Sequence, residues 1–532
     1  MLTARGVTRI LGGRVVLDAV SCTVGERTRL GVVGRNGVGK STLLRALAGI
    51  EELDGGTVER NPPSSTVGYL PQEPDAVPGE TLRAYLARRT GIADAERDLD
   101  AMTEALAEDP DALDRYTAVL DRFLALGGGD FEARVGAVCA DVGLPADRLD
   151  VAMTDLSGGQ AARAALAAIL LSRVDVLLLD EPTNNLDFAG LERLERFLAE
   201  RPGGLVVVSH DRAFLDHAVD RMLELHEETH RATEFAGGWS DYVAARELAL
   251  GQQRVAHEKY RAQRAELEDR ARRQRQWSEV GVRKVKKGGE PDKNLRQRKM
   301  QRSEKQAAKV RISEKRLEVL EVVDKPWEGW QLHMQLGAAG RSGDVVARLS
   351  GAVVERGRFT LGPLDLEIGW QDRVALLGPN GSGKSTLLGA LLGRLPLASG
   401  DRFVGPGVIV GEMDQTRAAY GTDASVLDTL IADTGLRIDE ARSLLAKFGL
   451  GADAVHRPGV ALSPGERTRA VLASLMARGV NFLVLDEPTN HLDVEAIEQL
   501  ELALDGYDGT LLLVTHDRWL LDAVKLTHEI VL

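Results

Sequence analysis

The sequence has few of the features that mark a membrane protein, a secreted scaffold or a metal cluster. Its two cysteines, Cys22 and Cys139, form no CxxC pair, which excludes a disulfide framework and a zinc or iron–sulfur site. No apolar run approaches the roughly 18 residues of a membrane-spanning helix. The stretch Met1–Ile10 lacks the apolar segment of a secretory signal. We therefore expect a cytoplasmic chain in a reducing compartment, with no membrane contact of its own.

Aromatic residues and net positive charge are also scarce. Aromatics make up 4% of the 532 residues and the net charge is −13, which argues against a chain covered uniformly in nucleic-acid-binding surface. The hydrophobic content of 44% suits soluble domains with apolar cores. A chain of this length is long enough for three to four domains of about 150 residues each.

One set of motifs occurs twice along the chain. A phosphate-loop motif lies at Gly34–Ser41 (GRNGVGKS) and again at Gly378–Ser385 (GPNGSGKS). Each is followed by an LSGGQ-like motif, a DEPTN-x-LD motif and an HDR motif. The serine of the LSGGQ-like motif precedes the first aspartate of DEPTN-x-LD by 23 residues in both copies, and that aspartate precedes the HDR histidine by 30 in both. Two copies of one domain are therefore predicted.

The phosphate loops predict nucleotide binding in each copy. Each loop lies between an expected strand (29–33 and 373–377) and an expected helix, so backbone N–H groups can surround phosphates. The lysine adds a point charge for the β- and γ-phosphates, and the next serine offers a hydroxyl to Mg²⁺. The predicted contacts are Gly34, Asn36, Gly37, Gly39, Lys40, Ser41 and Thr42 in the first copy, and Gly378, Asn380, Gly381, Gly383, Lys384, Ser385 and Thr386 in the second.

Two apolar runs, Val176–Leu179 and Phe482–Leu485, predict buried strands that end in carboxylates. The first carboxylate would bind Mg²⁺, and the glutamate after it would position or deprotonate the attacking water. A glutamine would sense metal and water, and a histidine would contact the γ-phosphate. The predicted catalytic residues are Glu181, Glu487, His210, His516, Gln72 and Gln415, and the predicted metal ligands are Ser41, Gln72, Asp180, Ser385, Gln415 and Asp486.

The first copy carries an acidic insertion. Residues 93–134 hold 12 Asp or Glu against four Arg, and they predict two short helices broken near Asp109–Pro110 and at Gly127–Gly129. Because an acidic surface repels phosphates, a partner of the insertion would be a basic protein rather than RNA. A solvated helical decoration without a partner is the alternative.

Positive charge is concentrated between the two copies. Residues 252–316 contain 22 Lys or Arg and nine Asp or Glu, a net charge of +13. Two runs of helix-forming residues, about 240–279 and 293–323, predict a helical hairpin with its tip at about 280–292. Phosphate neutralisation dominates RNA affinity, so the hairpin is predicted to probe RNA, although a passive charged spacer stays open. The RNA-binding candidates at the tip are Arg283, Lys284, Lys286 and Lys287.

With the P-loop, the glutamine, the LSGGQ signature, DEPTN-x-LD and the histidine in this order twice, the chain resembles the ATP-binding cassette superfamily. The basic helical linker makes it similar to the ABC-F translation factors. The resemblance implies an α/β fold with two P-loop ABC-type ATPase cassettes (1–238 and 331–532) joined by a long α-helical hairpin linker (239–330). It also implies ATP and Mg²⁺ as cofactors, and a monomer whose cassettes pair with each other.

The resemblance further implies that the signature of each cassette covers nucleotide on the P-loop of the other. Ser157, Gly158 and Gly159 would then face Lys384, while Ser463 and Gly465 would face Lys40. In the second signature Pro464 and Glu466 replace Gly and Gln, so the two sites are expected to be unequal. An ABC-F protein would bind the ribosome at its tRNA exit site and place the linker against P-site tRNA or ribosomal RNA near the peptidyl-transferase centre.

Several alternatives remain at the level of sequence. The extended linker is similar to the antibiotic-resistance group of high-GC bacteria, but a housekeeping factor that relieves stalled or idle ribosomes fits too. An ATPase subunit of a transporter would have no use for the basic hairpin. Leu11 stands where the resemblance implies an aromatic ring that stacks on adenine, and in the second copy Phe359 is the aromatic residue nearby, so use of GTP stays open. The HExxH match at His226–His230 suggests a zinc hydrolase, but the flanking sequence predicts a strand, a turn and a strand.

Overall fold

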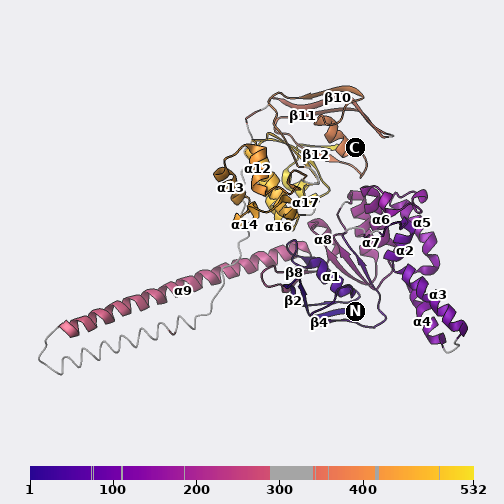
Figure 1. The fold of residues 1–532 in the computed structure, drawn as a ribbon, viewed down its shortest axis with the longest axis horizontal. Coiled ribbons are helices and arrows are strands. Elements are labelled where there is room, and N and C mark those ends of the chain that lie inside the picture. Colours follow the sequence, from indigo (N-terminus) through magenta and orange to yellow (C-terminus); the bar gives the residue numbers. More distant parts are fainter. Residues whose placement is uncertain are drawn as a thin grey trace. The chain divides into compact units, whose positions relative to one another are not determined.

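The computed structural model describes residues 1–72, 75, 77–108, 112–184, 186–287, 315, 340–341, 343–357, 359–413, 418–490 and 492–532. The chain divides into two compact units. One contains Met1–Tyr242 together with Trp330–Leu532, and the other is Val243–Gly329. The first unit holds both predicted copies, coloured indigo to magenta and orange to yellow in Figure 1.

The first copy is built on a six-stranded sheet with the strand order β5-β6-β7-β3-β8-β9. All neighbours are parallel except β8 and β9, which are antiparallel. Every residue of β6 and β7 is buried, as expected for the apolar runs VLLLD and GLVVV in a sheet covered on both faces. The strands are β3 (Arg29–Val33), β5 (Val67–Leu70), β6 (Val176–Asp180), β7 (Gly204–Val208), β8 (Arg221–Leu225) and β9 (Ala232–Ala236).

A smaller antiparallel sheet, β2-β1-β4, packs with helix α1 against this sheet. Leucines of α1 share one hydrophobic core with β1, β2, β3, β6 and β7. The bounds are β1 (Leu2–Leu11), β2 (Arg14–Val24), β4 (Gly55–Arg60), α1 (Lys40–Ala48), α2 (Leu82–Arg89), α6 (Gly158–Leu171), α7 (Phe188–Glu200) and α8 (Arg212–Ala218). The strand predicted at 29–33 is confirmed as β3.

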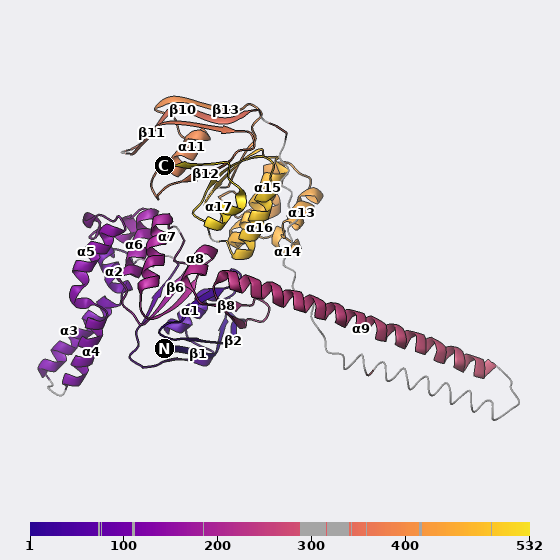
Figure 2. The same cartoon turned by 180° about the vertical axis from the view of Figure 1, so that it is seen from behind.

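The acidic insertion forms two helices that lie side by side, α3 (Ile92–Glu108) and α4 (Leu113–Ala125), as both views show (Figures 1 and 2). The predicted break at the glycines is confirmed, because α4 ends before Gly127, whose φ is +79°. The next helix, α5 (Phe131–Asp141), buries Phe131 and Val135, so it belongs to the body of the copy. The second of the two insertion helices therefore ends at Ala125.

The second copy repeats the architecture. Its parallel sheet has the order β14-β15-β16-β12-β17, and its antiparallel sheet has the order β11-β10-β13. The strands are β10 (Val345–Arg356), β11 (Phe359–Gly369), β12 (Arg373–Leu377), β13 (Ser399–Val404), β14 (Val410–Met413), β15 (Phe482–Asp486), β16 (Thr510–Val514) and β17 (His528–Val531). The helices are α11 (Lys384–Leu391), α12 (Val426–Thr434), α13 (Ile438–Lys447), α14 (Ala452–Val455), α15 (Pro464–Ala477), α16 (Val494–Asp505) and α17 (Arg518–Val524). The predicted repeat of one α/β domain is confirmed.

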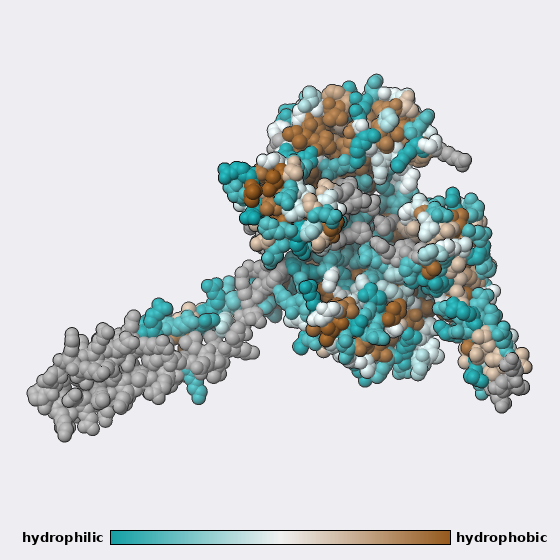
Figure 3. Space-filling view, in the orientation of Figure 1, coloured by the Kyte–Doolittle hydropathy of each residue, from teal (hydrophilic) through white to brown (hydrophobic). Residues whose placement is uncertain are grey.

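The first arm of the linker is one helix, α9 (Trp239–Lys287), of 49 residues. At 1.5 Å per residue it is about 74 Å long. It continues past residue 279, where the first helical run was predicted to end, into the residues predicted as the tip. Figure 3 shows hydrophilic side chains along the described part of its surface. The side chains of Arg283, Lys284, Lys286 and Lys287, and the second predicted run apart from Lys315, lie outside the described residues.

Within the described part of the chain, no helix is both long enough and apolar enough to cross a lipid bilayer.

Candidate functional site

Both phosphate loops depend on glycines that precede a helix. Gly39 and Gly383 take φ values of +111° and +107° at the N-termini of α1 and α11. A Cβ atom on Gly39 would also lie 2.7 Å from Val16 Cγ1, so the loop accepts only glycine there. Each loop therefore aims its N–H groups and a helix N-terminus at one point, as phosphate binding requires.

The P-loop lysines cross their own loops. Lys40 Nζ donates to the carbonyl oxygens of Gly34 at 2.7 Å and Arg35 at 3.1 Å. Lys384 Nζ donates to Gly378 at 2.7 Å and Pro379 at 3.2 Å. Burial lowers the pKa of both lysines, although nearby carboxylates oppose the shift. An anion bound at the loop would provide the partner that best favours the charged form.

The predicted Mg²⁺ ligands lie together in each copy. Ser41 is hydrogen-bonded to Asp180, and Ser385 Oγ donates to Asp486 Oδ2 at 3.4 Å. Tyr69 also donates from its hydroxyl to Asp180 Oδ2 at 3.2 Å. The other oxygen of Asp180, Oδ1, is buried without a hydrogen-bond partner. A hydroxyl and a carboxylate are hard oxygen ligands that fit Mg²⁺ shared with a nucleotide.

The two predicted catalytic glutamates follow directly after β6 and β15. Glu181 Oε1 lies 3.1 Å from His210 Nε2, and Glu487 Oε1 lies 3.4 Å from His516 Nε2. Both glutamates have left-handed backbones, with φ of +51° and +47°. Strain of this kind persists where the surrounding structure fixes a functional side chain.

Burial sets the proton affinity of these groups. It raises the pKa of Glu181 to about 7 and that of Glu487 to about 8. It lowers the pKa of His516 to about 4 and that of His210 well below its ordinary value. A glutamate whose pKa lies near working pH is suited to take a proton from water, with a neutral histidine beside it.

The cavity at Lys40, of about 360 Å³, belongs to the first copy alone. Gln72, Asp180 and Glu181 line it together with Lys40, as predicted from the sequence. Its apolar wall includes Leu11, so an aliphatic side chain stands where a base-stacking ring was expected. The signature residues Ser463 and Gly465 are not among its lining residues.

The cavity at Lys384, of about 570 Å³, is shared by both copies. Gly158 and Gly159 of the first signature line it opposite Lys384, which is the arrangement that the family resemblance implies. Ser157 begins α6 as an N-cap instead, accepting from Gln160 N. The ring of Phe359 lines this cavity too. The predicted glutamine of this copy, Gln415, lies outside the described residues.

Two aspartates that end the DEPTN-x-LD motifs link the copies, a role that sequence reasoning missed. Asp187 Oδ2 accepts from Asn380 N at 2.9 Å, and Asp493 Oδ2 accepts from Asn36 N at 3.2 Å. The other oxygen of each aspartate caps α7 or α16. The sequence signal was an aspartate directly before an amphipathic helix, which predicts the cap. The bonds to Asn380 N and Asn36 N each join a P-loop to the opposite copy.

Ion pairs between the copies surround these links. Arg212 pairs with Glu501 and Arg518 with Glu195, with Nη1–Oε distances of 3.1 and 3.0 Å. The four residues occupy equivalent positions, so the two pairs are related by the repeat. The sequence did not indicate these pairs, because the partners lie in different copies.

The HExxH match is not a metal motif. β8 ends at Leu225 and β9 begins at Ala232, so His226–His230 lies in the turn between them. His226 Nε2 is hydrogen-bonded to Thr233 Oγ1 at 2.8 Å. The strand–turn–strand prediction is confirmed, and the helical face that a zinc hydrolase needs is not formed. No group of three or more potential His, Cys, Asp or Glu ligands gathers among the described residues.

Replacing Lys40 or Lys384 by alanine is expected to weaken ATP binding at the altered site about 10- to 100-fold, because a charge-assisted contact is worth about 1.5–3 kcal/mol. Titration of a fluorescent ATP analogue against each single variant would show one weakened class of site and one retained class. Equal affinity in both variants and the unaltered chain would contradict the assignment of these lysines. Lys525→Ala serves as the control, because Lys525 is exposed and lines neither the cavity at Lys40 nor that at Lys384.

Comparison with known proteins agrees with this geometry. The family model described as "ABC transporter" matches residues 17–184 and 361–490. The chain is 36% identical to the tylosin resistance ATP-binding protein TlrC of Streptomyces fradiae, over 97% of this chain and 94% of TlrC. It is 33% identical to the energy-dependent translational throttle protein EttA of Escherichia coli K12, over 97% of this chain and 89% of EttA.

Solved structures match the tandem arrangement as well. The archaeal ribosome recycling factor aABCE1, solved with the ribosomal stalk protein aP1, aligns with a TM-score of 0.57 at 20% identity, over 99% of this chain and 87% of that one. At this identity the likeness concerns the fold. Two matched cassette regions, two P-loops with their strand-end carboxylates, and relatives that match along most of their length lead to one conclusion: the chain is a nucleotide-binding ATPase that belongs to the ABC-F family of ATP-binding cassette proteins.

Proposed function

We propose that this ATPase associates with the ribosome and protects it against antibiotics. The observation that carries the proposal is the 49-residue helix α9, which leads from the first cassette into a segment with a net charge of +13 between residues 252 and 316. Such a helix suits entry into RNA, where phosphate neutralisation supplies most of the affinity. Similarity to the tylosin resistance protein TlrC supports the protective role, and similarity to the translational throttle protein EttA supports a role in translation.

At each nucleotide site we assign roles to the residues that the structure brings together. Lys40 and Lys384 bind the phosphates of ATP. Backbone N–H groups of the two glycine-rich loops donate hydrogen bonds to the same phosphates. Asp180 and Asp486, together with Ser41 and Ser385, would hold Mg²⁺, which would neutralise negative charge on the nucleotide phosphates. Glu181 and Glu487 accept a proton from the attacking water. Gln72 orients that water in the first site, and His210 and His516 meet the γ-phosphate.

Nucleotide binding is coupled to closure of the cassette pair. Gly158 and Gly159 already share the cavity of Lys384, and Asp187 and Asp493 hold the opposite P-loops. ATP bound at these surfaces adds contacts to both cassettes and so favours the closed pair, while hydrolysis removes the γ-phosphate contacts. The closed pair is the state that binds the ribosome.

The remaining parts follow from this assignment. The cassettes occupy residues 1–238 and 331–532, and the linker 239–330 reaches P-site tRNA or ribosomal RNA near the peptidyl-transferase centre. The acidic helices α3 and α4 contact a basic ribosomal protein, because their negative charge attracts a positively charged surface. Similarity to a translational throttle protein, EttA, favours a second candidate function, a housekeeping role in translation. The form of that role that we consider is relief of stalled or idle ribosomes.

Expression in a tylosin-susceptible bacterium tests the protective role. Growth should continue at several-fold higher tylosin concentrations, and the purified chain should pellet with ribosomes in ATP when hydrolysis is blocked. Failure to pellet in any nucleotide would contradict ribosome association. Pelleting without any gain in tylosin tolerance would instead favour the housekeeping role.

Neutralising Lys284, Lys286 and Lys287 together tests the linker. The slope of log affinity for ribosomes against log salt should become shallower by about 2, because each phosphate that a lysine neutralises on single-stranded RNA adds about 0.7 to the slope. ATP hydrolysis without ribosomes should stay unchanged. A matched control neutralises three exposed arginines of the first cassette, Arg5, Arg14 and Arg27, and should leave the slope unaltered. An unaltered slope in the linker variant would contradict binding of RNA by the linker tip.

A further inference from the structure

The last two residues of α2 fold back toward the chain segment that carries Gln72. Arg89 Nη2 donates to the carbonyl oxygen of Tyr69 at 2.8 Å, and Arg89 Nη1 pairs with Asp75 Oδ2 at 3.2 Å. Tyr69 lies three residues before Gln72 and Asp75 lies three residues after it. The Arg89 side chain is only 9% exposed. One guanidinium group therefore bonds the chain both before and after Gln72.

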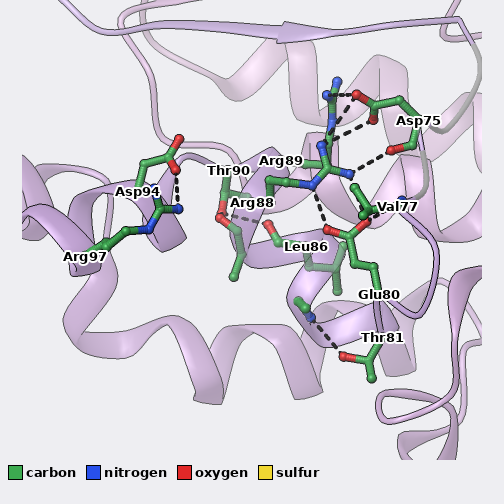
Figure 4. Close-up of polar contacts among 12 residues, drawn as sticks. Asp75, Val77, Glu80, Thr81, Leu86, Arg88, Arg89, Thr90, Asp94 and Arg97 are labelled. Carbon is green, nitrogen blue, oxygen red and sulfur yellow. Dashed lines mark hydrogen bonds and ion pairs between the residues drawn. The ribbon is translucent and has the colours of Figure 1, made fainter.

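Arg88 completes the arrangement from the neighbouring position, as Figure 4 shows. Its Nε and Nη2 donate to the two carboxylate oxygens of Glu80 at 2.6 and 2.9 Å, and Nη2 also donates to the carbonyl oxygen of Asp75 at 2.8 Å. The Glu80 side chain is 8% exposed, and its hydrogen bonds to Arg88 lower the pKa of the carboxyl. A two-pronged arginine–carboxylate pair of this kind fixes direction as well as distance.

Glu80 gives this group a fixed base. Its carbonyl oxygen accepts from Met153 N at 2.9 Å, and the adjacent Thr81 forms an isolated bridge with Ala152. The same Thr81 caps α2 by accepting from Ala84 N. Arg88 and Arg89 thus connect Asp75 to the body of the cassette. We call Arg88, Arg89, Asp75 and Glu80 the arginine clamp.

The clamp also lies close to the reacting groups. Tyr69, whose carbonyl oxygen Arg89 holds, donates its own hydroxyl to Asp180 at 3.2 Å. Gln72 lines the cavity at Lys40 together with Asp180 and Glu181. A displacement of the segment between Tyr69 and Asp75 would therefore move Gln72 relative to the strand-end carboxylates.

The second cassette has other residues at these positions. Thr81 and Ser425 are the N-caps of the equivalent helices α2 and α12, and both lie in an isolated bridge to the segment before the signature. Counting from these caps, the positions of Glu80, Arg88 and Arg89 are taken by Ala424, Ala432 and Asp433. Asp433 accepts a hydrogen bond from Ser474 instead. Among the described residues of the second cassette, the clamp therefore has no counterpart at the equivalent positions.

We propose that Arg88 and Arg89 are positioning residues that hold Gln72 in place for hydrolysis at the first nucleotide site. The inference rests on the role proposed above for Gln72. Arg89 fixes the two chain positions around the glutamine, and Arg88 fixes Asp75 through the buried Glu80. Small displacements of a group that orients a reacting water cost rate far more than affinity.

The test uses the full chain in two backgrounds that each leave one site able to hydrolyse ATP. Glu487→Gln leaves the first site and Glu181→Gln leaves the second. Arg89→Ala should lower kcat about tenfold in the first background, with KM changed less than about twofold, and should leave both constants unchanged in the second. Arg97→Ala is the matched control, because Arg97 lies close by on α3 and forms an exposed ion pair with Asp94 at 2.8 Å, apart from the clamp (Figure 4).

Two further measurements separate positioning from general stability. Amide hydrogen exchange should rise in the peptide spanning residues 69–80 of the Arg89→Ala variant, with little change in melting temperature. Arg89→Lys should not restore kcat, because an ammonium group cannot bond Tyr69 and Asp75 in two fixed directions as the guanidinium fork does. Full activity of Arg89→Lys, or an equal loss of kcat in both backgrounds with a falling melting temperature, would overturn the inference.

Gln72→Ala, measured alongside, keeps the two proposals distinguishable. If Gln72→Ala leaves first-site hydrolysis intact, the proposed role of Gln72 is wrong and the clamp has nothing to position. If Gln72→Ala lowers kcat while Arg89→Ala and Arg88→Ala do not, the role of Gln72 stands and the clamp inference alone is overturned.

Discussion

Replacing Glu181 and Glu487 by glutamine is expected to slow ATP hydrolysis about a thousandfold while ATP still binds. Glutamine has nearly the shape of glutamate and keeps hydrogen-bonding capacity, but it cannot accept a proton from water. The double variant should therefore accumulate in the ATP-bound, closed state and pellet with ribosomes more completely than the unaltered chain.

The structure explains why these two side chains are expected to matter so much. Both follow an apolar strand run that ends in the aspartate proposed to bind Mg²⁺, and both lie within 3.4 Å of a histidine nitrogen. Burial raises the pKa of Glu181 to about 7 and of Glu487 to about 8, which gives each carboxylate a higher affinity for a proton than an exposed glutamate has.

Phosphate release and equilibrium binding of ATP measure the two halves of this expectation. Glu192→Gln with Glu498→Gln is the matched control, since these exposed glutamates occupy equivalent positions on α7 and α16. Hydrolysis that falls less than about tenfold in the double variant would show that another group takes the proton. The single variants additionally report each site, and unequal rates would follow from their different surroundings.

Patterns among neighbouring residues predict much of this fold. The strand predictions at 29–33 and 373–377 match β3 and β12 because each apolar run is followed at once by a glycine-rich loop. The turn at His226–His230 was predicted for the same reason, since polar residues separate two short apolar runs. In each case the deciding residues are neighbours in the chain, so their pattern alone selects the structure.

Contacts between distant residues could not be predicted in this way. Asp187 was readable as a helix cap, but its bond to Asn380 N joins residues 193 positions apart. Phe131 lies within the predicted acidic insertion, yet its side chain is buried, which the acidic composition of the surrounding residues does not indicate. The first linker helix was placed too short, since it continues through Gly281 to Lys287. A glycine in a helix interior costs about 1 kcal/mol, which does not end a helix of 49 residues.

The ion pairs between the cassettes could not be predicted from the sequence either, and we expect their loss to impair the protein strongly. Arg212→Glu should lower ATP-dependent closure about 100-fold or more, because breaking a buried ion pair costs about 3–5 kcal/mol. The Arg212 side chain is 5% exposed and that of its partner Glu501 is 17% exposed. The reversed charge would also place two carboxylates against each other. Steady-state hydrolysis should fall with closure, since the cavity at Lys384 needs both cassettes.

Charge exchange makes the expectation specific to the pair. Combining Arg212→Glu with Glu501→Arg should recover most of the lost hydrolysis, whereas either change alone should not. Arg196→Glu, which reverses an exposed charge on α7, is the control and should have little effect. If the combined variant hydrolyses ATP no faster than the single variants, Arg212 acts through a residue other than Glu501, for example through Trp519, whose ring centroid lies 5.0 Å from the guanidinium carbon.

If the single variants hydrolyse ATP at the normal rate, closure does not depend on this pair. Recovery, in contrast, would show that the two cassettes approach each other through this contact during turnover, because a charge exchange can restore activity only where both side chains meet.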